Sequence, residues 1–227
     1  DEVGQKLPQI RYHKIGGADS LVFEAFGGAN ATEKFKAMAL DVHHALVYRI
    51  LGNAEIPLSV YVVKKNGDGF SQTAKPLIAP HKYWGRLVGK YGSNVILRTS
   101  QPGNNYGLVA VDAFTGKTRV IVPAEKDLVL IQAQQISYRL VLQYFDKELN
   151  NKIRVTDIEG KILTEFTPTE VGLPGRGSFS LLTGTEQSLQ ADFTFSSATS
   201  ATETLRFDSK TNKITLLKRF IISPCIV

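Results

Sequence analysis

Four histidines are the residues of this chain with the clearest catalytic potential: His13, His43, His44 and His81. A histidine that acts as a catalytic base needs a nucleophilic Ser or Cys within hydrogen-bond reach and a carboxylate that orients its ring. One of the four falls in a predicted strand, the adjacent pair in a predicted turn, and the last beside a proline. This placement favours surface or packing histidines over a catalytic base.

Metal binding is not indicated either. His43 and His44 are adjacent, so in an extended segment their rings point to opposite faces and do not readily share a metal. The single cysteine, Cys225, has no second thiol for a disulfide and no histidine at a zinc-site spacing. The sequence therefore predicts no catalytic residue, no metal site and no cofactor. One thiol and a start without signal-peptide character favour a reducing compartment, and we expect a cytoplasmic protein.

Serine chemistry lacks its usual local setting. The Gly-x-Ser-x-Gly elbow that presents a nucleophile in α/β-hydrolases does not occur in the sequence. Gly175-Arg176-Gly177-Ser178 is rich in glycine, but it opens a predicted strand and not a helix, which argues against a phosphate-binding loop. We interpret this stretch as a flexible link between two structural units.

Three aspartates, Asp112, Asp157 and Asp208, end strand-like runs that are followed by short polar turns. We expect each carboxylate to accept N–H groups of its own turn, and not to form a paired acid–base site. The tips of four such turns carry residue types that reach positive φ easily: Gly67, Gly116, Gly160 and Asn212. These tips are 49, 44 and 52 residues apart. A strand-only period of about 40 to 50 residues is typical of a four-stranded propeller blade.

The predicted fold is therefore all-β: a β-propeller with about four and a half four-stranded blades, occupying residues 1–227 as one partial domain. The predicted units are a half-blade at 10–26 and blades at about 36–79, 86–122, 128–166 and 178–219. Closed propellers usually have four to eight blades, so the unmatched half-blade indicates part of a larger ring. Residues 31–38 are compatible with a short helical turn, although a connecting loop is favoured.

Composition supports a protein that buries a substantial core, with 43% hydrophobic and 21% charged residues. No apolar stretch approaches the roughly 20 residues that span a bilayer, so we expect no membrane insertion. The net charge is +6, but the longest basic runs are pairs, Lys64-Lys65 and Lys218-Arg219. Scattered basic residues are typical of a solvated surface, and we expect no nucleic-acid partner.

The order of several short segments resembles the propeller domain of the prolyl oligopeptidase family of serine peptidases. Each segment is short, but their order and spacing together are specific, and the match extends to about Phe220. The segments are residues 11–16, 21–24, 99–106, 121–127, 140–144, 173–178 and 193–197. The resemblance covers only the later part of the family's propeller. The sequence departs from the family's pattern in two places: the Ser197-to-Ala201 loop, which lacks a bulky residue, and the final stretch after Phe220.

The resemblance implies a function. In this family a seven-bladed propeller caps an α/β-hydrolase domain and admits short peptides to an internal cavity. This chain would then be a non-catalytic propeller segment that gates access of short peptides to an active site on a hydrolase domain in cis. The full-length parent would be a serine-type prolyl endopeptidase. Asn53, in the turn after Gly52, is the one candidate binding residue on the cavity wall, and an ordinary turn asparagine is the favoured alternative.

Two alternatives remain open from the sequence. The first is a stand-alone propeller that binds a protein partner or acts as a scaffold. The second is a truncated, inactive member of the family. A half-blade also leaves strand edges and apolar sheet faces uncovered. We therefore expect self-association through exposed blade edges.

Overall fold

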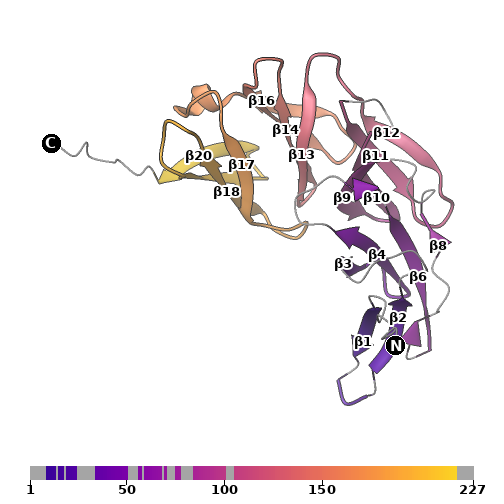
Figure 1. The fold of residues 1–227 in the computed structure, drawn as a ribbon. Helices are drawn as coiled ribbons and strands as arrows, with labels where there is room; N and C mark the ends of the chain where they lie inside the picture. Colours follow the sequence, from indigo (N-terminus) through magenta and orange to yellow (C-terminus); the bar gives the residue numbers. More distant parts are fainter. Residues whose placement is uncertain are drawn as a thin grey trace, which may run out of the picture.

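Twisted antiparallel sheets stand side by side along a curved array in the computed structural model (Figure 1). The structure describes residues 9–13, 15–17, 19–24, 34–50, 56–57, 59–67, 69–70, 75–77, 84–100 and 105–218. A two-stranded hairpin lies at one end of the array and the sheet β17–β20 at the other. The first strands β9 and β13 lie toward the concave side, and the last strands β12 and β16 toward the convex side.

The N-terminal part consists of the hairpin and one irregular sheet. The hairpin pairs β1 (Gln9–His13) with β2 (Asp19–Glu24). The sheet contains β3 (Lys34–Ala39), β4 (His44–Ile50), β6 (Val60–Asn66), β7 (Gly69–Phe70) and β8 (Lys75–Pro76). Both interpretations of residues 31–38, the helical turn and the favoured connecting loop, are wrong from Lys34 onward, because β3 pairs along its whole length with β4. Tertiary pairing overrides the weak local helix signal.

Three further sheets have four consecutive antiparallel strands each. The first is β9 (Trp84–Tyr91), β10 (Asn94–Thr99), β11 (Gly107–Asp112) and β12 (Thr118–Val122), with β5 (Ile56–Pro57) added to β9. The second is β13 (Val129–Ile136), β14 (Arg139–Phe145), β15 (Asn151–Asp157) and β16 (Ile162–Phe166). The third is β17 (Ser178–Thr183), β18 (Gln190–Ser196), β19 (Glu203–Asp208) and β20 (Lys213–Lys218). Repeated four-stranded meanders of this kind form a β-propeller, and the predicted fold class is confirmed.

The turns between third and fourth strands have the predicted backbone. The four tip residues all have positive φ: Gly67 58°, Gly116 73°, Gly160 90° and Asn212 55°. Gly160 also makes a close approach, since a Cβ there would lie 1.9 Å from the carbonyl oxygen of Ile121. A side chain at that position would therefore clash as well as strain the backbone.

Apolar side chains fill the space between neighbouring sheets. One cluster joins β3–β8 to β9–β12 and includes Leu46 and Val109, and a second joins β9–β12 to β13–β16 through Leu108 and Leu142. A third cluster packs β13–β16 on β17–β20, with Phe195 fully buried. The hairpin packs on the first sheet around Val22. Burial of this apolar surface is the main force that holds the sheets together.

The links between sheets are short and ordered where the structure describes them. A 3₁₀ helix, η1 (Pro168–Val171), lies between β16 and β17 and is the only helical element among the described residues. The Gly175–Gly177 link, predicted to be flexible, forms hydrogen bonds to β15, and its flexibility stays a prediction. Asn151 donates its backbone N–H to the Gly175 oxygen at 2.9 Å and its side-chain amide to the Gly177 oxygen at 2.8 Å. Two backbone carbonyls of the link are thereby held against β15.

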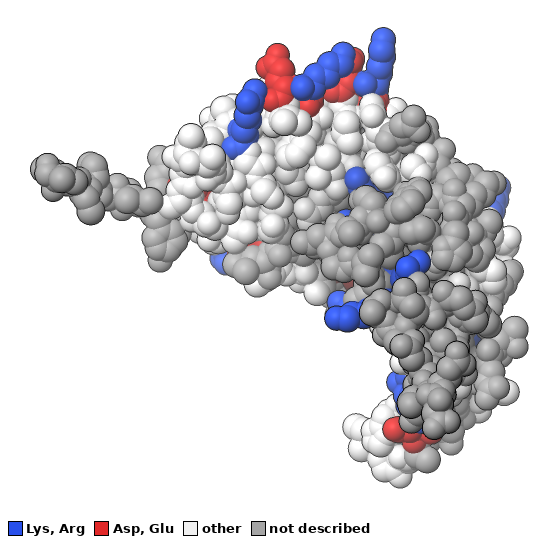
Figure 2. All heavy atoms as spheres, viewed as in Figure 1, with Lys and Arg blue, Asp and Glu red and all other residues white. Residues whose placement is uncertain are grey.

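No helix in the described part of the chain is long and apolar enough to cross a membrane. Figure 2 shows acidic and basic side chains interspersed along the upper edge of the molecule. The assignment of residues 1–227 to a single partial domain, with the predicted unit boundaries, stays a prediction, as does the cytoplasmic location.

Candidate functional surface

Two of the four histidines lie beside aspartates. His13 Nδ1 is 2.8 Å from Asp19 Oδ1, and His44 Nδ1 is 3.0 Å from Asp41 Oδ1. Among the described residues, no serine hydroxyl bonds to either ring, so neither pair is extended to a nucleophile. His43 lies in the exposed β3–β4 turn, and His81 lies outside the described residues. Within the same residues, no group of three or more His, Cys, Asp or Glu side chains is arranged to hold a metal ion.

The three predicted turn aspartates accept hydrogen bonds from their own turns, as expected. Asp112 Oδ1 accepts the N–H of Thr115 at 2.8 Å, Asp157 Oδ1 that of Glu159 at 2.9 Å, and Asp208 Oδ1 that of Lys210 at 2.9 Å. Hydrogen bonds from Ser93 and Thr115 hold the pKa of Asp112 far below its usual range. Those from Gln190 and Thr211 lower the pKa of Asp208 to about 2. These carboxylates stabilise hairpins, and separate sheets hold them apart.

The first strands of neighbouring sheets meet closely on the concave side. Gly89 of β9 packs against Gln135 of β13, and a Cβ on Gly89 would lie 2.0 Å from Gln135 Oε1. The Gln135 amide donates to the backbone oxygens of Lys90 at 2.9 Å and Ser137 at 3.1 Å. Lys90 in turn donates its ammonium group to the Leu40 oxygen at 3.1 Å. A chain of hydrogen bonds therefore ties three consecutive sheets together beside the concave surface.

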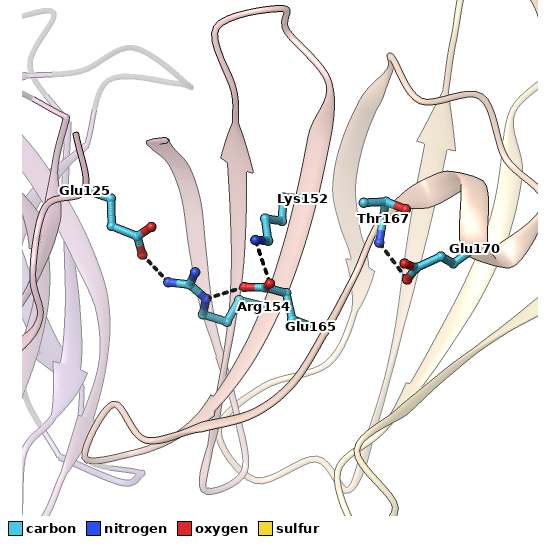
Figure 3. Close-up of polar contacts among 6 residues, drawn as sticks. All are labelled: Glu125, Lys152, Arg154, Glu165, Thr167 and Glu170. Carbon is cyan, nitrogen blue, oxygen red and sulfur yellow. Dashed lines mark hydrogen bonds and ion pairs between the residues drawn. The ribbon is translucent and has the colours of Figure 1, made fainter. Parts of the chain in front are cut away.

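A charged cluster joins the next part of the array (Figure 3). Arg154 of β15 contacts Glu125, which precedes β13, and donates from Nε to Glu165 Oε2 of β16 at 2.8 Å. Lys152 Nζ lies 2.6 Å from the other oxygen of Glu165. Burial alone lowers the pKa of Arg154, but the hydrogen bonds to both glutamates outweigh it and raise the pKa. The arginine stays charged and holds the link that precedes β13 against β15 and β16.

An aromatic ring completes this cluster on its buried side. The Arg154 guanidinium lies 4.9 Å from the centre of the Tyr144 ring, a distance at which cation–π attraction operates. Burial raises the pKa of Tyr144 to about 12, so its hydroxyl is neutral. The close-up also shows the Glu170 carboxylate accepting the N–H of Thr167 at 3.1 Å, which stabilises the first turn of η1.

A groove of about 230 Å³ separates the β1–β2 hairpin from β3 and β4. Its walls combine Tyr12 and Val22 of the hairpin with Met38 and Ala45 of the facing sheet. Asp41 and His44, whose contact is described above, also line the groove. The groove shows that the hairpin covers the first sheet incompletely.

Asn53, the one residue predicted to face the cavity, lies outside the described residues, so its role stays a prediction. Three residues were missed at the sequence level: Lys90 and Gln135, which join neighbouring sheets, and Arg154, which holds the link between two sheets. Their partners are 50, 45 and 29 residues away in the chain. Spacing along the chain carries no signal for such contacts.

The consecutive four-stranded antiparallel sheets, with the first strands β9 and β13 packed closely together, define a β-propeller. The model of the prolyl oligopeptidase N-terminal β-propeller domain matches residues 8–219. The chain therefore belongs to this family, and the resemblance seen in the sequence is confirmed.

Solved structures show the same fold. One comes from a structural and mechanistic study of two prolyl endopeptidases. It is 22% identical in sequence, with a TM-score of 0.72, and the match covers 95% of this chain and 31% of the other chain. A prolyl oligopeptidase B from Galerina marginata bound to a 35mer hydrolysis and macrocyclization substrate is 18% identical, with a TM-score of 0.73 and coverage of 99% and 32%. The same fungal enzyme bound to a 25mer macrocyclization substrate is 17% identical in sequence, with a TM-score of 0.74. The chain thus spans about a third of the length of these structures. A comparison with curated protein sequences gives no match.

Proposed function

We propose that this propeller segment restricts access of peptides to the active site of a prolyl oligopeptidase-like serine peptidase. The active site would lie on a hydrolase domain in the same polypeptide, and short proline-containing peptides would be the substrates. The observation that carries the proposal is the family match over residues 8–219, together with coverage of only 31% of a prolyl endopeptidase chain. The remaining length of such enzymes leaves room for the catalytic domain.

The joints between sheets give the proposal a physical basis. A propeller excludes large substrates only if its blades do not separate easily. In this chain, hydrogen bonds and ion pairs supplement the apolar contacts between the sheets. Gln135 of β13 bonds to Lys90 of the neighbouring sheet, and Arg154 of β15 holds Glu125 in the link between the sheets β9–β12 and β13–β16. Both sets of contacts involve buried side chains, Gln135 at 4% and Arg154 at 8% exposure. Such desolvated contacts are stronger than surface ion pairs.

The test uses the full-length product of the gene that encodes this chain. We expect cleavage after proline in a short fluorogenic peptide, and little cleavage of a long unfolded polypeptide with the same site. Arg154→Ala should raise cleavage of the long substrate relative to the short one, because it removes the contact that holds the link between the sheets β9–β12 and β13–β16. Arg206→Ala, which removes an ion pair within the sheet β17–β20, is the matched control and should leave the ratio unchanged.

Two results would contradict the proposal. A gene that encodes no hydrolase domain leaves nothing to gate, and a full-length enzyme that cleaves both substrates equally does not select by size. The 227-residue chain alone is expected to cleave neither substrate.

A further inference from the structure

The β6–β7 hairpin begins its turn differently from the three equivalent hairpins. Strands β11, β15 and β19 each end in an aspartate whose carboxylate accepts N–H groups of the following turn. Strand β6 instead ends in Asn66, which is exposed and is followed directly by Gly67 at the tip. Within the described part of the chain, the Asn66 side chain forms no hydrogen bond. A free carboxamide therefore stands where the other hairpins have an engaged carboxylate.

Asn66 and Gly67 form the single asparagine–glycine pair of the sequence. The carbonyl carbon of an asparagine side chain can be attacked by the backbone nitrogen of the next residue, which closes a five-membered ring. A side chain on that next residue crowds the attacking nitrogen, and glycine has none. The surrounding structure adds no obstacle, because a Cβ on Gly67 would meet no other atom within 4 Å. The reacting nitrogen at the tip is thus accessible.

Few backbone contacts hold the end of this hairpin. Strand β7 has two residues, and they pair with β6 as Phe70 on Lys65 and Gly69 on Asn66. The β19–β20 ladder, in comparison, contains five residue pairs. A short ladder at the end of a strand opens locally at a small cost in free energy. Asn66 therefore has the freedom to turn its carboxamide toward the backbone nitrogen of Gly67.

We propose that Asn66 is a site of spontaneous deamidation. The Gly67 nitrogen attacks Cγ of Asn66 and gives up its proton to the departing amide nitrogen, so that ammonia leaves and a cyclic succinimide remains. Water then adds to the ring and breaks one of its two C–N bonds. Rupture of the bond to Cγ leaves an aspartate, and rupture of the bond to the main-chain carbonyl carbon leaves an isoaspartate. The sum converts a carboxamide and water into a carboxylate and ammonia, with no oxidant or reductant.

The isoaspartate product changes the contact between the first sheet and the β1–β2 hairpin. It adds a methylene group to the backbone of β6, so the pairs that join Asn66 and Lys65 to β7 lose their register. The next residue of that ladder, Phe70, packs edge to face on Tyr12 of the hairpin with ring centroids 5.6 Å apart. Both rings line the groove between the hairpin and the sheet. Deamidation therefore loosens the hairpin.

The experiment incubates the full-length product of the gene that encodes this chain in neutral and in mildly alkaline buffer. Mass spectrometry of its peptides should show a gain of about 1 Da at Asn66 that increases with time. An isoaspartyl methyltransferase should label the same peptide. The rate should rise with pH, because base removes the proton of the attacking Gly67 nitrogen.

Asn212 is the matched control within the same molecule. It lies at the tip of the β19–β20 turn, its Oδ1 accepts the Arg139 Nε–H at 2.7 Å, and Lys213 follows it. Ammonia loss should be at least about tenfold faster at Asn66, because its turn opens more easily. Gly67→Ala should slow the reaction by a similar factor, since a Cβ crowds the nitrogen and opposes the φ of 58°. Equal rates at the two asparagines overturn the proposal. So does an unchanged Asn66 after the time in which a synthetic peptide of residues 62–71 is fully deamidated.

Hydrogen exchange tests the effect on the hairpin. Backbone amides of β1 and β2 should exchange several-fold faster in the aged chain than in the fresh chain, whereas those of β14 should not change. Asn66→Ser cannot form the ring and should keep slow exchange after the same incubation. Equal hairpin exchange in aged and fresh protein overturns the assigned loosening. Neither measurement uses peptide cleavage, so this inference and the proposed gating function fail independently.

Discussion

The sheets β13–β16 and β17–β20 have the same topology but differ in how their faces are used. In β14, five successive residues from Leu140 to Tyr144 are buried, whichever face they point to. In β18, burial alternates strictly, with Ala191, Phe193 and Phe195 inside and the residues between them partly exposed. The first sheet is thus covered on both faces and the second on one.

The uncovered face of β17–β20 carries rows of polar residues, and Leu217 of β20 is exposed beside them. Thr215, Arg206 and Asp192 form a row across three neighbouring strands, and Arg206 binds both oxygens of Asp192 at 2.7 and 2.9 Å. Thr194 and Thr204 form a second row beside it. A neighbouring sheet or second copy would meet hydrogen-bonding groups there. Self-association through blade edges stays a prediction.

The largest expected effect tests this difference directly. Leu142→Ala on β14 should reduce the free energy of unfolding by about 2–5 kcal/mol, because it leaves a cavity in a fully buried interface. Thr194→Ala on the uncovered face of β18 should change it by less than about 0.5 kcal/mol. Urea denaturation of both variants gives the two values. Equal losses would mean that the face of β17–β20 is covered in solution.

Charged pairs provide the next comparison. Arg154→Ala leaves Glu125 and Glu165 without their partner, and both carboxylates are about one-third exposed, at 33% and 32%. We expect a loss of about 2–3 kcal/mol, below the range for fully buried pairs because solvent reaches the carboxylates. Arg206→Ala breaks an ion pair on the open face and should cost clearly less. Urea titrations of both variants measure the loss of unfolding free energy. A larger loss for Arg206→Ala than for Arg154→Ala would contradict the stabilising role assigned to the Arg154 contacts.

Much of the fold was predictable because its signals are local. The four turn tips have the positive φ that their residue types favour. The alternation in Gln190–Ser196 also carried a readable signal of one-sided burial, in contrast to the apolar run Leu140–Leu142 in β14.

The joints between sheets were not predictable in the same way. Gln135 bonds to a backbone oxygen 45 residues earlier, and nothing in its neighbours marks it as different from Gln134. Such contacts depend on how one sheet is rotated against the next, which is a property of packing and not of local sequence. The single candidate site residue, Asn53, came from family resemblance alone and is untested.

The link into β17 offers a smaller test, based on space. A Cβ on Gly177 would lie 2.3 Å from the ring of Phe195, which is fully buried. Gly177→Ala should therefore cost about 1–2 kcal/mol through overpacking of the interface between the two sheets. Gly175→Ala is the matched control, because the nearest atom to its Cβ would be 3.6 Å away. Thermal unfolding compares the two, and equal melting temperatures would show that the link does not pack as described.

The smallest expected effect concerns acid, and it asks whether hairpins of the open and covered sheets behave alike. The pKa of Asp208, on β19, is lowered to about 2, mainly by hydrogen bonds from Gln190 and Thr211, and that of Asp112, on β11, is lowered by its bonds to Ser93 and Thr115. A carboxyl with a lowered folded-state pKa stabilises the fold above its unfolded-state pKa of about 3.9 and loses that contribution as pH falls. We therefore expect melting temperatures to fall between about pH 4 and 2, and less steeply in Asp208→Asn and Asp112→Asn. Glu148→Gln, in the β14–β15 connection, is the control. A shallower slope in only one aspartate variant would show that the turns of β9–β12 and β17–β20 differ in their energetics, whereas equal slopes would show that the two turns behave alike.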